Sequence, residues 1–127
     1  MGYTTDYANE ILTNTFSGAY IALATSAPTA DTSGSGLAEP STTAGYARSE
    51  ASTGKFSAAE RKITNYAYIY FPEATDSWGT ITHMCVTTAK TGGRLRYFGA
   101  LKNSVPVPAN SVPLFKPEAI NISLDAD

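Results

Sequence analysis

The first apolar pattern of the chain has the period of a helix. Between residues 5 and 16 the apolar side chains recur at spacings of three and four, which is the spacing of one face of an α-helix. Thr4 or Thr5 suits the start of such a helix, and Gly18 suits its end. A helix of this length is not stable alone, so its apolar face must dock on the chain's own body or on a neighbouring subunit. The residues of this face are Tyr7, Ala8, Ile11, Leu12 and Phe16.

After residue 18 the pattern predicts strands. Residues 19–25 are apolar on both faces, and residues 46–51 form a short candidate strand. Two further segments, 79–89 and 94–101, flank Lys90-Thr91-Gly92-Gly93. Glycines between two β-type segments are typical of a hairpin, so we expect a hairpin over residues 79–101.

Residues 62–71 alternate over their whole length. Ile63, Ala67, Ile69 and Phe71 share one face, and Tyr66, Tyr68 and Tyr70 share the other. The tyrosine face is either packed beneath a loop or a second sheet, or it is exposed. An exposed tyrosine row is typical of subunit interfaces and sugar-binding surfaces, because the rings offer contact area with few rotatable bonds.

Two segments interrupt the strand pattern. Residues 26–45 are rich in Ser, Thr, Ala, Gly and Pro and predict a long loop, the best candidate for a surface arm. Residues 105–117 hold four prolines, which indicate an edge strand or irregular structure. The chain alternates again at 119–124, as expected of a last strand. The whole of 1–127 therefore predicts a single, mainly β domain: an antiparallel β-sandwich or small barrel of six or seven strands with one short N-terminal helix.

Composition excludes several classes of protein. The net charge is −2 and only 16% of the residues are charged, which excludes a basic nucleic-acid binder and a highly charged disordered chain. No segment approaches the roughly 20 apolar residues of a membrane helix, so we expect no membrane partner. The N-terminus lacks the features of a signal peptide, which predicts synthesis in a cytoplasm.

The residues that could carry chemistry are few. His83 is the only histidine and Cys85 the only cysteine, so neither a disulfide within the chain nor a metal or cofactor site is expected. The two residues could form a nucleophile and base on one strand face, but they lie mid-strand, so a structural role for His83 is favoured. Arg48 and Glu50 are expected to pair on one strand face, and Trp78 to close one end of the sandwich.

The order of segments resembles a family of small tailed-bacteriophage virion proteins of the tail or tail-fibre type. The resemblance covers nearly the whole chain, and its most specific parts are the Trp78-Gly79-Thr80-Ile81-Thr82-His83 run and the Thr91-Gly92-Gly93 turn. Further matching segments are Tyr20–Thr25, Gly45–Arg48, Ile69–Ala74, Ala89–Leu95 and Tyr97–Leu101. The sequence departs from the family pattern at Met84-Cys85-Val86 and in the proline-rich stretch.

The resemblance implies a non-enzymatic structural protein of the virion, made in the host bacterial cytoplasm and present in several copies. A tail, neck, baseplate or fibre component is the leading interpretation, and a capsid-decorating head fibre is an alternative within the same class. Its partners would be other virion proteins and copies of itself. From the helix face and the tyrosine row, independently of the resemblance, we expect the contact residues to be Tyr7, Ile11, Leu12, Tyr66, Tyr68 and Tyr70.

Two hypotheses come from other classes of protein. The chain could be a carbohydrate-binding module that uses Tyr66, Tyr68, Tyr70 or Trp78 to stack on host glycans. It could also be a small hydrolase built on Cys85 and His83.

Overall fold

The computed structural model describes residues 4–29, 32–51 and 55–123. The chain begins with helix α1 (Thr5–Phe16), which spans the range that the apolar spacing predicts. The Thr4 side chain accepts a hydrogen bond from the backbone N–H of Tyr7 at 3.2 Å and so caps the first turn. Gly18, at φ +79°, then turns the chain directly into the first strand.

Four antiparallel strands form sheet A. They are β1 (Ala19–Ala24), β2 (Ser49–Ala51), β6 (Gly79–Thr87) and β7 (Leu95–Val107), in the order β2-β1-β6-β7. Strands β6 and β7 are the two arms of the predicted hairpin, and they pair from Gly79↔Val107 to Thr87↔Leu95 with register shifts between. Strand β7 is therefore an edge strand. Proline has no N–H to donate to a neighbouring strand, so an edge strand is where a sheet tolerates Pro106.

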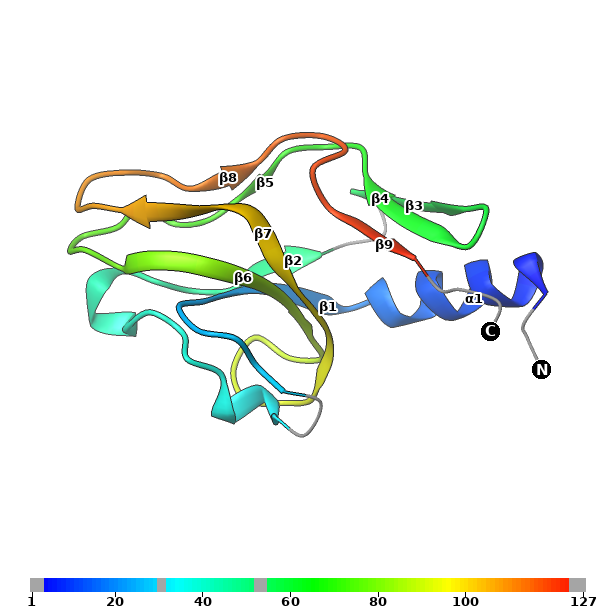
Figure 1. Ribbon diagram of the computed structural model, residues 1–127, viewed down its shortest axis with the longest axis horizontal. Coiled ribbons are helices and arrows are strands. Elements are labelled where there is room, and N and C mark those ends of the chain that lie inside the picture. The colour runs from blue at the N-terminus through cyan, green and yellow to red at the C-terminus, as the bar shows by residue number, and fades with distance from the viewer. Residues whose placement is uncertain (1–3, 30–31, 52–54, 124–127) are drawn as a thin grey trace.

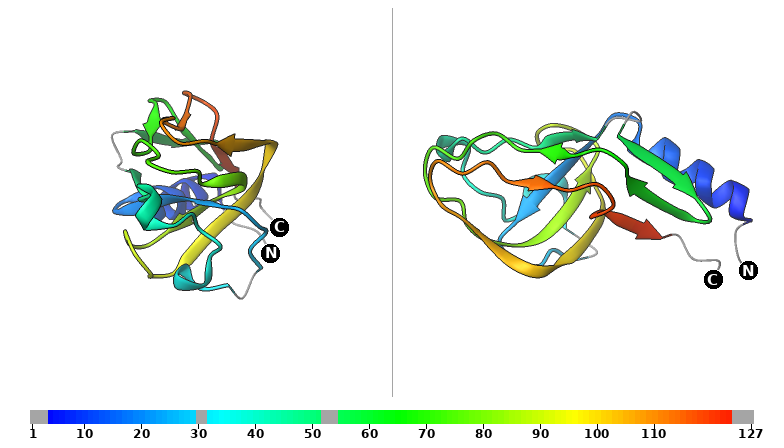
Figure 2. Two further views of the ribbon diagram at one scale, coloured as in Figure 1. Left: turned by 90° about the vertical axis from the view of Figure 1, so that its left-hand side faces the viewer. Right: turned by 90° about the horizontal axis from the view of Figure 1, so that it is seen from above.

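A second layer consists of two smaller sheets. Sheet B has the order β3-β4-β9, from β3 (Phe56–Ala59), β4 (Lys62–Asn65) and β9 (Asn121–Ser123). Strands β5 (Ile69–Tyr70) and β8 (Leu114–Phe115) form a separate two-stranded ladder. Helix α1 packs against β3 and β4, and these elements extend beyond the end of sheet A (Figure 1; Figure 2, right).

The core lies between sheet A and this second layer, as in a small β-sandwich. Strand β1 contributes to both of its faces, as its apolar pattern predicts: Ile21 and Leu23 point into the main core, whereas Ala22 and Ala24 pack around Cys85 on the other face. The main core is filled by large buried side chains from all layers, namely Leu12, Phe16, Ile21, Leu23, Phe56, Ile63, Ile69, Phe71, Trp78, Ile81 and Val86.

The prediction of one strand over residues 62–71 is wrong, because the chain breaks between β4 and β5. The reason is Asn65, which is fully buried. Its side-chain NH₂ donates to the carbonyls of Ala67 and Lys116, both at 2.9 Å, and its side-chain oxygen accepts from the N–H of Ile120, also at 2.9 Å. A buried amide must satisfy its hydrogen bonds, so it ties this corner to the returning C-terminal segment. The alternation of faces nevertheless continues across the break.

Three other predictions need adjustment. The strand expected at 46–51 begins only at Ser49, since the residues before it enter a buried polar network. The long loop contains two short 3₁₀ turns, η1 (Gly34–Gly36) and η2 (Thr42–Ala44). The described residues contain nine strands rather than six or seven, because β3 and β8 were not expected and residues 62–71 contribute two.

We predict that Phe16→Ala lowers the free energy of unfolding by about 3–5 kcal/mol, since a buried aromatic is replaced by a cavity. Phe16 joins α1 to both layers: its ring centroid lies 4.7 Å from that of Phe56 and 6.4 Å from that of Tyr97. Urea unfolding followed by circular dichroism measures the effect. The control Tyr70→Ala removes an exposed ring and should cost less than about 1 kcal/mol; equal losses in the two variants would contradict this packing.

Candidate interaction surface and the buried Arg48 network

The tyrosine row predicted from the alternation is exposed. Tyr66, Tyr68 and Tyr70 are 55%, 44% and 57% exposed, and the rings of Tyr68 and Tyr70 stack with centroids 5.7 Å apart and planes 25° apart. Tyr70 lies directly opposite Leu114 in the β5–β8 ladder, and Leu114 is also exposed. We call these four residues the tyrosine surface. Exposed aromatic and aliphatic side chains that lie together on a sheet are typical of protein contact sites.

The helix residues proposed for an interface are placed differently. Leu12 is fully buried in the chain's own core, together with Ala8 and Phe16. The docking face of α1 is therefore covered by the chain itself, and Leu12 is not available to a neighbour. Ile11 is half-buried, while Tyr7 is 51% exposed on the outer side of the helix.

Trp78 is buried, as expected of a residue that closes one end of the core. Its indole N–H donates to the carbonyl of Ala44 at 2.9 Å. The rings of Trp78 and Tyr46 make an edge-to-face contact, with their centroids 5.2 Å apart. A sugar stacks on an exposed ring face. Trp78 is therefore unavailable for the glycan binding that the sequence allowed, and only the three tyrosines remain for it.

The two residues of the hydrolase hypothesis do not form a nucleophilic pair. Cys85 is fully buried among Ala22, Ala24 and Leu37. Burial, reinforced by the negative charge of Glu39, raises the pKa of the Cys85 thiol to about 12, so the thiolate is disfavoured at neutral pH. His83 instead shares a hydrogen bond of 2.8 Å between its Nδ1 and the hydroxyl of Thr82. In the described ranges, no three His, Cys, Asp or Glu residues gather as a metal site would require.

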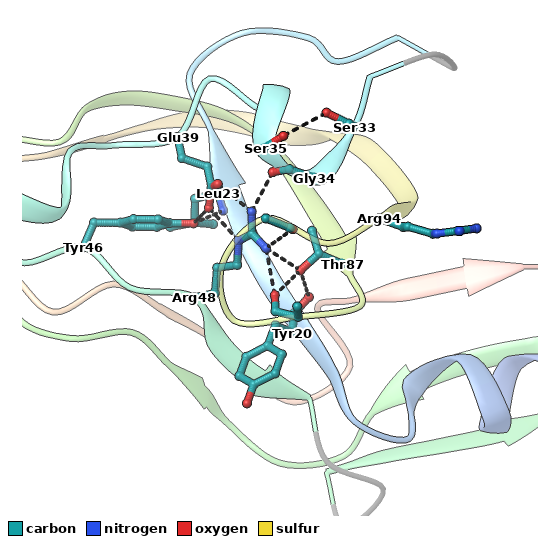
Figure 3. A network of polar contacts seen from close by, with 12 residues as sticks. Tyr20, Leu23, Ser33, Gly34, Ser35, Glu39, Tyr46, Arg48, Thr87 and Arg94 are labelled. Atoms are coloured by element: carbon teal, nitrogen blue, oxygen red, sulfur yellow. Dashed lines mark hydrogen bonds and ion pairs between the residues drawn. The ribbon is translucent and has the colours of Figure 1, made fainter.

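A buried polar network surrounds Arg48, whose partner is not the Glu50 that the sequence predicts. The Arg48 guanidinium is buried and pairs with Glu39, not with Glu50 (Figure 3). Its Nη2 lies 2.8 Å from Oε1 and its Nε lies 2.9 Å from Oε2 of Glu39, a two-pronged ion pair. Glu50, which lies in β2 two residues after Arg48, is exposed.

The remaining donors of Arg48 reach three other segments. Nη2 donates to the carbonyl of Gly34 at 2.7 Å, and Nη1 donates to the carbonyls of Ala89 and Gly92 at 2.7 and 2.9 Å. Nη1 also lies 3.1 Å from the hydroxyl of Thr87. One side chain, directly before β2, thus joins the long loop to the β6–β7 turn, and both segments are visible around it in Figure 3.

The long loop is consequently not a free arm. Gly34 lies against the β6–β7 turn so closely that a side chain there would collide with the carbonyl oxygens of Gly92 and Gly93. The N–H and the hydroxyl of Thr25 both donate to the carbonyl of Ala38, at 2.9 and 3.1 Å, and Leu37 covers Cys85. Residues 34–39 therefore fold back over the outer face of sheet A, whereas Ala44 packs in the main core.

Tyr46 completes the network. Its hydroxyl donates to Oε2 of Glu39 and accepts the N–H of Leu23 at 3.1 Å. Burial and the hydrogen bond to Glu39 raise the pKa of Tyr46 far above its ordinary value. The hydrogen bond to Glu39 also raises the pKa of Arg48, so the guanidinium stays charged. One signal in the sequence could have indicated this role: Arg48 is the first basic residue of the chain, after four acidic ones.

We predict that Arg48→Ala lowers the free energy of unfolding by about 3–5 kcal/mol, because it leaves Glu39 and several carbonyls without their buried partner. Glu39→Gln should cost nearly as much, whereas the control Glu50→Gln should stay within about 0.5 kcal/mol. In Arg48→Ala the amide of Thr25 should also lose its protection against hydrogen exchange, since the loop is released. An unchanged Thr25 amide would show that the loop is held by other contacts.

We predict a second, pH-dependent effect from Tyr46. Above about pH 10 the unfolded chain loses the tyrosine proton that the folded chain retains, so stability falls as pH rises, by up to about 1.4 kcal/mol per pH unit. The Tyr46→Phe variant has no such titrating group. At pH 7–9 the chain with Tyr46 should have the larger free energy of unfolding, and above pH 10 its difference from Tyr46→Phe should shrink. Both chains carry Cys85→Ala, which removes the titration of the buried thiol. A difference that stays constant up to pH 11.5 would contradict the prediction.

Helices in the described part of the chain are too short or too polar to span a bilayer. No curated protein is significantly similar to the sequence. A family model described as podophage GP4 fiber I protein gp80 matches residues 5–123. The match runs from the start of α1 to the end of β9 and so takes in both layers of the sandwich, the Arg48 network and the tyrosine surface. The chain therefore belongs to the podophage GP4 fiber I protein gp80 family, and it is a fibre-type structural protein of the phage virion.

Proposed function

We propose that this fibre protein is a non-enzymatic part of the phage tail that is held in the particle through its tyrosine surface. The observation that carries the proposal is the exposure of Tyr66, Tyr68 and Tyr70, the last of which pairs with the exposed Leu114 in the β5–β8 ladder. Aromatic side chains on a fixed backbone bind a protein partner at low entropic cost. The partner is a neighbouring virion protein, and several copies of the chain are present in each particle.

The state of Cys85 supports the non-enzymatic part of the proposal. A nucleophilic cysteine needs a lowered pKa and an accessible sulfur, and Cys85 has a raised pKa and a buried one. The polar groups of the Arg48 network are likewise occupied with one another, which suits a structural role. They hold the loop and the β6–β7 turn in place rather than face a substrate.

Replacing Tyr66, Tyr68 and Tyr70 together by Ser should remove the chain from the particle. Truncating a central aromatic of an interface costs about 2 kcal/mol or more, which corresponds to roughly a 30-fold loss of affinity. The experiment supplies the variant in trans to a phage that lacks the gene, and mass spectrometry then measures the chain in purified particles. The control variant, Ser57→Ala with Lys62→Ala, alters exposed residues of sheet B instead.

Circular dichroism of both purified variants separates loss of binding from loss of fold. Incorporation of the folded triple variant at the level of the control would contradict the proposed role of the tyrosine surface. Cryo-electron microscopy of particles with and without the chain tests its position: density lost at the tail supports the proposal. Density lost on the capsid surface favours the head-fibre alternative.

One observation favours a second candidate function, the binding of host glycans. The rings of Tyr68 and Tyr70 stack at the surface, and exposed aromatic rings can also bind the apolar faces of sugars. A glycan array distinguishes the two functions. An architectural contact gives no signal, whereas glycan binding gives a signal that the triple tyrosine variant loses.

A further inference from the structure

The charges of this chain are segregated between two elements. Helix α1 carries Asp6 and Glu10 and has no basic residue. The β6–β7 hairpin, from Gly79 to Val107, carries four lysines and arginines and no acidic residue: Lys90, Arg94, Arg96 and Lys102. The net charge of −2 conceals this separation of an acidic helix from a basic hairpin.

Both sets of charges face solvent. Asp6 and Glu10 lie on the side of α1 that is left when Ala8, Leu12 and Phe16 are buried, and all four hairpin cations are exposed. Among the described residues none of the six takes part in an ion pair. Arg94 points away from the Arg48 network, out of the turn (Figure 3). Four residues after Arg94, the ring of Phe98 is 43% exposed.

The spacings of the two sets are compatible. Asp6 and Glu10 are one helical turn apart, which places their Cβ atoms about 5–6 Å from each other. Arg94 and Arg96 are two residues apart in an extended segment, which corresponds to about 6.5 Å. Each set also has an exposed aromatic side chain close by in the sequence. Tyr7, 51% exposed, follows Asp6, and Phe98, 43% exposed, lies two residues after Arg96.

The acidic and basic sets cannot meet within one chain, because α1 is fixed on β3 and β4 by its buried face. They can meet between chains. We propose that the β7 end of the hairpin, with Arg94, Arg96 and Phe98, is a docking surface for helix α1 of a second copy of this chain. The contact joins two different surfaces, so each copy keeps one free end, and repetition gives a ring or a filament.

The same cations suit an anionic polymer less well. Nucleic-acid binding needs many phosphate contacts, and the hairpin offers only four cations on a chain of net negative charge. The acidic counterpart, in contrast, is present on every copy. This contact uses neither Tyr66, Tyr68 nor Tyr70, so the inference goes beyond the proposed tail attachment and stands or fails separately from it.

The test measures the mass of the purified full chain by analytical ultracentrifugation at about 20 mM and 300 mM salt. Association driven by surface charges should weaken strongly over this range, because the screening length falls from about 20 Å to about 6 Å. Arg94→Gln with Arg96→Gln should raise the dissociation constant by roughly tenfold, and Asp6→Asn with Glu10→Gln should do the same. The matched control Lys62→Gln with Glu60→Gln changes exposed charges on sheet B and its turn and should have no effect.

Mixing the two neutralised variants gives the sharpest result. Each retains one of the two surfaces, so the mixture should form a one-to-one dimer that cannot grow. At a protein concentration between the dissociation constants of the unsubstituted chain and the variants, each variant alone should be mainly monomeric. A chain that is monomeric at low salt overturns the inference, and so does association that neither charge pair alters. Binding of heparin by the chain, lost in Arg94→Gln with Arg96→Gln, combined with a monomeric state, assigns the hairpin to an anionic polymer instead. None of these outcomes bears on the tyrosine surface, which the particle experiment tests separately.

Discussion

The buried charge of Arg48 is the constraint on which much of this structure depends. A guanidinium removed from water needs a counter-charge and a partner for each of its N–H groups. No single neighbouring element offers them all, so the structure supplies them from the carboxylate of Glu39 and from backbone carbonyls of the long loop and the hairpin turn. Residues that would otherwise form a flexible surface segment become a cover for the outer face of sheet A.

A second buried polar group, Asn65, acts at the end of β4 in the second layer. It interrupts the alternating segment. Its side-chain amide makes hydrogen bonds to the carbonyls of Ala67 and Lys116 and to the N–H of Ile120. These bonds hold the C-terminal segment in place, so that β9 lies beside β4. The strand that follows, β5, forms its own ladder with β8, and Tyr70 and Leu114 of the tyrosine surface pair with each other there. In both places a polar side chain, rather than apolar packing, decides where a strand ends.

Outside these two networks lie the two surfaces for which we propose contacts. The tyrosine surface is aromatic and uncharged, as is usual for a persistent contact between proteins. The acidic outer side of α1 and the basic hairpin are polar, salt-sensitive and complementary. A fibre protein needs both attachment to the particle and, where it is repeated, a contact between copies.

Local patterns in the sequence determined the helix over residues 5–16, the β6–β7 hairpin, the β-sandwich class and the separation of the tyrosines from the apolar face. Each depends on neighbouring residues, since a helix face, a glycine turn and strand alternation repeat over a few positions. Tertiary structure alone decided the partner of Arg48, the break at Asn65, the burial of Leu12 and the closed position of the long loop. Those outcomes depend on groups many residues apart, for example Arg48 with Gly34 and Gly92. A buried charge or amide takes whichever partners the fold brings within reach, and no periodicity along the chain records that choice.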